Sequence, residues 1–171
     1  MTFSSGRPRR DPHGWNRWGN YLQSHFGHIQ RLLDEGFLVE DLLSIAVSGV
    51  DLITIEGKLV CEHGLEVSVT KALDVQGDRV RTFKYSYHAA FSDPHRRIFR
   101  YDNAHPWPHH ADAHHKHVYS PPGSPEPGRV TWVGYDDWPS LFDVVQELRD
   151  WWEETGQYLD PDRLPIDPDV R

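Results

Sequence analysis

Residues 79–103 read RVRTFKYSYHAAFSDPHRRIFRYDN, and this stretch decides the fold. From Arg79 to His88 the residue types alternate, so that Phe83, Tyr85 and Tyr87 share one side of an extended chain with Arg81. Val80, Thr82, Lys84, Ser86 and His88 fall on the other side. A second extended segment, 97–103, follows the turn signal Ser-Asp-Pro at 92–94. Because parallel strands need a long crossover, this short link predicts an antiparallel hairpin.

The same two-residue alternation extends through the middle of the chain. It predicts strands over 42–48, 52–61, 64–75, 79–88 and 97–103, joined by short turns. Apolar residues at three- and four-residue steps predict one helix from Trp15 to Gly36 and another from Trp138, with Asp137 as its N-cap. The expected fold class is α+β, an antiparallel β-meander of four to five strands packed with an N-terminal and a C-terminal helix.

The length of 171 residues fits one domain. We expect a flexible basic arm at 1–13, a single α+β domain at 14–157 and an acidic, Pro-rich, disordered tail at 158–171. Within the domain, 104–131 is rich in His and Pro and has no sustained period, which predicts a long loop. The single Cys61 excludes an internal disulfide, and no apolar run has the length of a membrane span, so we expect a cytoplasmic protein.

The formal net charge of −8 argues at first against a nucleic-acid partner, whose phosphates attract a basic surface. The charge is unevenly distributed, however. Residues 79–117 contain seven Lys or Arg against three Asp, whereas residues 136–171 contain eleven acidic residues against three Arg. The middle of the chain is therefore basic, and RNA remains a candidate ligand.

Histidine is the residue type that points to chemistry, because eight of the twelve lie between positions 88 and 117. In an extended segment His115 and His117 would point the same way and Lys116 the opposite way. One interpretation is a metal-free ribonuclease with no cofactor, in which His115 and His117 exchange protons with the substrate. Arg100 and Lys116 would stabilise the phosphorane charge, while Tyr101 and Asp102 would position the reacting groups. Further candidates for substrate binding are Asn103, Tyr87, Trp107 and His114.

Two other interpretations stay open. His115 and His117, with Asp102 and His105, form a credible nitrogen and oxygen ligand set for zinc or another divalent transition metal. That set would make the protein a metal-dependent nuclease or hydrolase. In the third interpretation the chain is a non-catalytic binding module that acts by occupying a partner.

Three motifs in fixed order add a family resemblance. They are Tyr-Ser-Tyr-His at 85–88, Phe-Arg-Tyr-Asp-Asn-Ala at 99–104 and His-His-Lys-His-Val at 114–118, with a Pro- and His-rich loop between the last two. From about Leu42 to Trp152 the chain resembles the TumE family of toxin–antitoxin systems. The loop departs from the family pattern, because it reads HPWPHH at 105–110 instead of Pro-His-His-Pro. The resemblance implies a toxin whose partner is a cognate antitoxin of the helix-turn-helix type; a homodimer is a further expectation.

Overall fold

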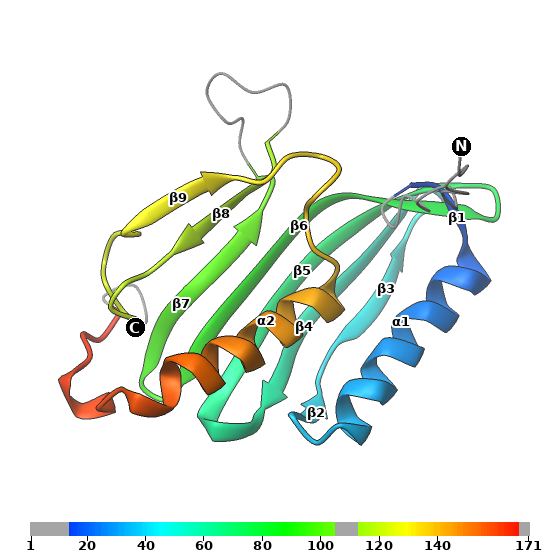
Figure 1. Cartoon of the computed structure of the whole chain (residues 1–171). Coiled ribbons are helices and arrows are strands. Elements are labelled where there is room, and N and C mark those ends of the chain that lie inside the picture. The colour runs from blue at the N-terminus through cyan, green and yellow to red at the C-terminus, as the bar shows by residue number, and fades with distance from the viewer. Residues whose placement is uncertain (1–13, 105–112, 168–171) are drawn as a thin grey trace, which may run out of the picture.

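The computed structural model describes residues 14–104 and 113–167 (Figure 1). In this part of the chain nine strands form one antiparallel sheet, and two helices lie on the same face of it. The strands are β1 (Asn16–Arg17), β2 (Leu38–Asp41), β3 (Ser44–Ser48), β4 (Leu52–Cys61), β5 (Leu65–Gln76), β6 (Arg79–Ser92), β7 (His95–Asp102), β8 (His115–Val118) and β9 (Arg129–Trp132), and the helices are α1 (Trp18–Asp34) and α2 (Leu141–Glu154). The α+β class is therefore confirmed.

The strands follow the order β2-β4-β5-β6-β7-β8-β9, with β3 also paired to β4 and β1 to β6. The five predicted strands correspond to β3 through β7, so the predicted number of four to five strands was too low. The four missed strands have two to four residues each, which is too short for a two-residue period to stand out. Two of them, β8 and β9, begin inside 104–131, and the prediction of one continuous loop there was wrong.

A β-bulge in β6 corrects the predicted division of that strand into two faces. The register with β5 runs through Ala72 opposite Lys84 and then moves to Leu73 opposite Thr82, which leaves Phe83 as an additional residue. Beyond the bulge the alternation is inverted. Val80 is consequently buried beneath the helices, as Tyr85 is, although the sequence placed these two residues on opposite faces.

Both helices pack on one face of the sheet. Helix α1 buries Ile29 and Leu32, and α2 buries Leu141, Val144, Val145 and Leu148, all in one core with side chains of β4 to β7. The N-cap of α2 is Ser140, three residues later than the predicted Asp137, because Ser140 and Asp143 form a reciprocal capping box. Neither helix in the described ranges has the length and apolar content needed to cross a membrane.

The acidic tail is described as far as Asp167. Gly156–Tyr158 and Pro161–Arg163 form short 3-10 turns, and the Asp167 side chain is buried against β7. There its carboxylate contacts the Arg97 guanidinium, with 2.5 Å between Oδ2 and Nε. This part of the tail, predicted to be disordered, thus has a defined path. The predicted arm at 1–13 lies outside the described residues.

Candidate active site

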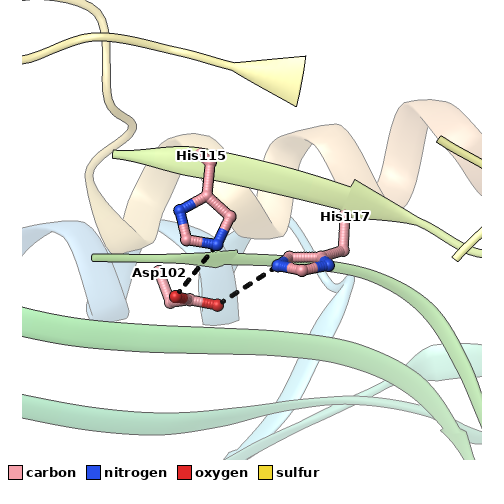
Figure 2. Close-up of side chains that lie close together, drawn as sticks. All are labelled: Asp102, His115 and His117. Atoms are coloured by element: carbon pink, nitrogen blue, oxygen red, sulfur yellow. Dashed lines mark ion pairs between the residues drawn. The ribbon is translucent and has the colours of Figure 1, made fainter. Parts of the chain in front are cut away.

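A cluster of charged side chains lies on the sheet face that the helices leave free. In the register of β7 and β8, Asp102 is directly opposite His115, and Arg100 is directly opposite His117. Directly opposed residues of antiparallel strands share a face, so these four side chains project together. Figure 2 shows both imidazoles turned from β8 toward the Asp102 carboxylate on β7. We call these four residues the Asp102 cluster.

The Asp102 carboxylate is the centre of the cluster. Its Oδ2 is 2.6 Å from Arg100 Nε, and its Oδ1 is 3.3 Å from His115 Nε2. His117 Nε2 lies 3.8 Å from Asp102 Oδ2 and 3.0 Å from a terminal nitrogen of Arg100. One carboxylate therefore lies close to basic side chains of both β7 and β8.

The ring nitrogens of the two histidines contact different kinds of atom. His115 Nδ1 lies 2.6 Å from the Ala113 carbonyl oxygen, so both of its ring nitrogens face oxygen acceptors. A guanidinium is only a donor, so His117 Nε2 accepts from Arg100 and the His117 proton is on Nδ1.

Burial separates supporting side chains from reachable ones. The side chains of Asp102 and His115 are 2% and 0% exposed, whereas those of His117 and Arg100 are 12% and 25% exposed. A substrate at this face would meet Arg100 and His117. Asp102 and His115 can act on it only through those two residues.

His88 belongs to the same face and was not among the predicted site residues. It lies directly opposite Arg100 in the register of β6 and β7. Burial first, and then the charge of Arg100, lower the pKa of His88 to about 4, so its imidazole is neutral at neutral pH. His88, Arg100 and His117 thus form a row across three adjacent strands, which we call the His–Arg–His row. Only the strand register reveals it, because the three residues are 12 and 17 positions apart.

Lys116 and Tyr101 are on the other face, beneath α2. Lys116 Nζ forms an ion pair with Glu147 of α2 and lies 4.8 Å from the ring centre of Phe99. The Tyr101 hydroxyl donates to Glu147 Oε2 at 2.7 Å, and burial together with Glu147 raises the pKa of Tyr101. The prediction that His115 and His117 point away from Lys116 is confirmed, but the structure does not bring Lys116 and Tyr101 to the Asp102 cluster.

The predicted substrate-binding residues are dispersed. Tyr87 is fully buried in the core, and His114 is buried with its Nδ1 3.1 Å from the Tyr85 hydroxyl. Asn103 uses its side-chain amide to continue the ladder between β6 and β7, since it accepts from Tyr85 N–H and donates to the Phe83 carbonyl. His105 and Trp107 lie outside the described residues.

The donor set of a metal site is also present. Asp102, His115 and His117 offer ligand atoms that all lie within 4.8 Å of one another. A carboxylate with two imidazoles suits zinc and similar ions. The Arg100 guanidinium, however, contacts both Asp102 and His117, so its charge occupies the space where a cation would bind. A metal would require Arg100 to move away.

One comparison with known proteins identifies the chain. A model of the family described as "Toxin TumE" matches residues 29–158, which is most of the sequence and includes both the Asp102 cluster and the His–Arg–His row. No curated protein and no solved structure matched the sequence. The chain belongs to the TumE toxin family.

Proposed function

We propose that this toxin is a ribonuclease that cleaves RNA without a metal, at the His–Arg–His row. The observation that carries the proposal is the row itself: two imidazoles flank a guanidinium on one face of three adjacent strands. Adjacent strands lie about 4.8 Å apart, so about 10 Å of backbone separates His88 from His117. In this proposal a phosphodiester binds over Arg100, between the two rings.

Cleavage by the ribose 2′-hydroxyl needs a base, an acid and a cation, and the row offers all three. His88, neutral because of its low pKa, accepts the 2′-hydroxyl proton while the 2′ oxygen attacks phosphorus. Arg100 turns from His117 to the phosphate and stabilises the added negative charge. Once Arg100 has turned away, His117 Nε2 takes up a proton from water and donates it to the leaving 5′ oxygen. The products are a 2′,3′-cyclic phosphate and a 5′-hydroxyl.

Asp102 and His115 have a supporting role in this proposal. The Asp102 carboxylate contacts Arg100 Nε and so sets the direction of the guanidinium. Because His115 is fully buried, it does not reach the RNA and acts only through its contact with Asp102. This assignment makes His117 and Arg100 the RNA-contacting members of the cluster.

The first test is RNA cleavage by the purified chain in excess EDTA. We expect cleavage of an oligoribonucleotide to leave a 2′,3′-cyclic phosphate, and a single 2′-deoxy substitution at the scissile nucleotide to block it. His88→Ala and His117→Ala should each lower the rate by at least about 100-fold, the usual contribution of a general acid or base. His63→Asn is the matched control, because His63 is exposed at the β4–β5 turn and stacks on Trp152.

Growth arrest on expression is the second test. Wild type and His63→Asn should stop growth with degraded RNA, whereas His117→Ala should permit growth while the folded protein accumulates. Growth arrest by His117→Ala with intact RNA would contradict the ribonuclease and favour a non-catalytic binding module.

Membership in a toxin family implies an antitoxin partner. Our proposal for that partner is a protein of the helix-turn-helix type, and the cytoplasm is the compartment in which the toxin would meet RNA. Identification by mass spectrometry of the proteins that co-purify with the chain tests the first point directly.

Metal binding is the second candidate function, and the ligand set of Asp102, His115 and His117 favours it. It predicts stoichiometric zinc in untagged protein, lost in His117→Ala, and activity abolished by chelation. Arg100→Gln distinguishes the candidates further. Removal of the guanidinium would strengthen metal binding but would inactivate a metal-free ribonuclease.

A further inference from the structure

A half-buried lysine interrupts a row of core side chains in the middle of the sheet. On β5 the helix-covered face carries Leu65, Val67, Val69, Lys71 and Leu73, and every member except Lys71 is buried and apolar. Lys71 lies opposite Ile55 on one side and Tyr85 on the other, and both of these neighbours are buried. Lysine is among the residue types least often placed inside a protein. Its presence in this row therefore needs a reason other than packing.

Lys71 lines a cavity of about 1080 Å³ that also involves both helices. The lining comes from the chain before α1, from α1, from the sheet and from the start of α2. Five of the described lining residues are basic side chains (Arg17, His25, His28, Lys71 and Arg79), and none of the lining residues in the described ranges is Asp or Glu. The chain as a whole has more acidic than basic residues, so the lining of this cavity is more basic than the average composition of the chain.

Within residues 14–104 and 113–167 the ammonium of Lys71 forms no ion pair with a carboxylate. Its ammonium lies 5.0 Å from the ring centre of Tyr21, and burial lowers its pKa to about 8. Burial and then Lys71 lower the pKa of the neighbouring His25, although the charge of Asp41 opposes this shift. A partly desolvated cation costs stability unless an anion joins it. The cavity thus supplies the room and the charge for an anionic ligand.

Three further features of the lining describe that ligand. Arg79 adds a second cation, and Asn16, Asn20 and Gln23 add amide groups for hydrogen bonds. Trp15 and Phe142 add flat aromatic surface. Cations together with amides and aromatic rings recognise a phosphate joined to a planar base.

We infer that the cavity between α1, α2 and the sheet binds a mononucleotide, with its phosphate at Lys71. Ligand cavities in proteins hold about 300–1,000 Å³, so the volume suits a ligand of this size. The cavity lies on the helix-covered face and the His–Arg–His row on the opposite face. The inference is accordingly independent of the ribonuclease activity.

The test is calorimetric titration of the full chain with AMP and GMP, with adenosine and inorganic phosphate as partial ligands. We expect a mononucleotide to bind and to raise the melting temperature. Lys71→Met should raise the melting temperature of the free protein, because it removes an uncompensated charge, and should weaken nucleotide binding at least tenfold. A higher melting temperature together with weaker nucleotide binding would show that Lys71→Met removes a ligand contact and does not cause misfolding. Lys84→Met is the matched control, since Lys84 is exposed and lies opposite Ala72 on the other face.

Three results of the nucleotide titrations would overturn the inference. They are the absence of nucleotide binding at millimolar concentration, unchanged nucleotide affinity in Lys71→Met, and binding of adenosine or inorganic phosphate as tight as that of the nucleotides. Saturation of the cavity by an acidic peptide, without nucleotide binding, would also overturn it and assign the cavity to a protein partner.

Discussion

At the scale of single residues, Asp102 is the side chain on which the site geometry most depends. It is almost fully buried and contacts Arg100 and His115 directly. Removal of one partner from a buried charge cluster leaves the others uncompensated, which is far more costly than loss of an exposed ion pair. Asp102 therefore links the stability of the fold to the position of Arg100.

We expect Asp102→Asn to lower the free energy of unfolding by about 3 kcal/mol, measured by urea denaturation. The amide keeps the shape of the carboxylate, so the loss reports the charge. Asp74→Asn is the control, because Asp74 pairs with Arg81 on the surface and should cost less than about 1 kcal/mol. Equal losses in the two variants would show that the Asp102 cluster contributes no more than a surface pair.

Residue alternation predicted part of this site. His115 and His117 were placed on one face and Lys116 on the other because a strand has a period of two. The same rule puts Tyr101 and Asp102 on different faces of β7, yet Tyr101 and Lys116 were assigned to the site for their chemistry alone. His88 was missed because its place beside Arg100 depends on the β6–β7 register, which includes a shift near Ala89. Pairing between strands is a property of the fold and leaves no local pattern in the sequence.

At the scale of elements, β3 is an edge strand without the usual protection. It pairs only with β4 in the described part of the chain, has no charged residue and no proline, and exposes Val47 at 69%. Leu42 N–H donates to the Lys58 carbonyl, so in this register Ile45 and Val47 direct their backbone groups away from β4. The order Ser-Ile-Ala-Val-Ser at 44–48 is nearly symmetric about Ala46. Two copies can thus pair antiparallel, with Ile45 opposite Val47 of the second copy.

This pairing predicts a homodimer with its two-fold axis at Ala46. Non-hydrogen-bonded residues on such an axis have Cα atoms about 4.5 Å apart, which suits a disulfide. Ala46→Cys should therefore cross-link to a covalent dimer under mild oxidation, measured by non-reducing electrophoresis. The natural Cys61 does not interfere, because it is buried and its pKa is raised to about 12.

Ser48→Cys provides the control for the register. The two copies of residue 48 would lie about 14 Å apart along the strands, too far for a disulfide. Cross-linking of both variants, or of neither, would contradict pairing about Ala46. Val47→Lys should also convert the wild-type dimer to a monomer in sedimentation experiments, while Thr131→Lys on the opposite edge strand should not.

At the scale of the whole molecule, the distribution of charge connects the tail to the site. The sequence showed a basic middle and an acidic end but not their relative positions, since contacts between distant segments depend on tertiary structure. Asp167 contacts Arg97 at 2.8 Å or less and lies 3.6 Å from His95 Nδ1, at the other end of β7 from Asp102. Arg97 lies opposite Ala90 in the β6–β7 register, so it projects from the same face as His88 and Arg100. Asp167 therefore neutralises a cation, Arg97, on the face that we propose for RNA.

We expect Asp167→Asn to release this neutralisation. RNA bound over the His–Arg–His row would gain Arg97 as a further phosphate contact, so affinity should rise several-fold. The slope of log K against log salt should become steeper by about 0.7, the value for one added contact to a single strand. Fluorescence anisotropy with a labelled RNA at several salt concentrations measures both quantities.

Asp160→Asn removes the same charge from an exposed position in the tail and should leave the slope unchanged. An equal increase in slope for both variants would mean that net charge alone governs binding. A change confined to Asp167→Asn would place RNA on this face of the sheet, because only there does Arg97 lie within reach of the phosphates.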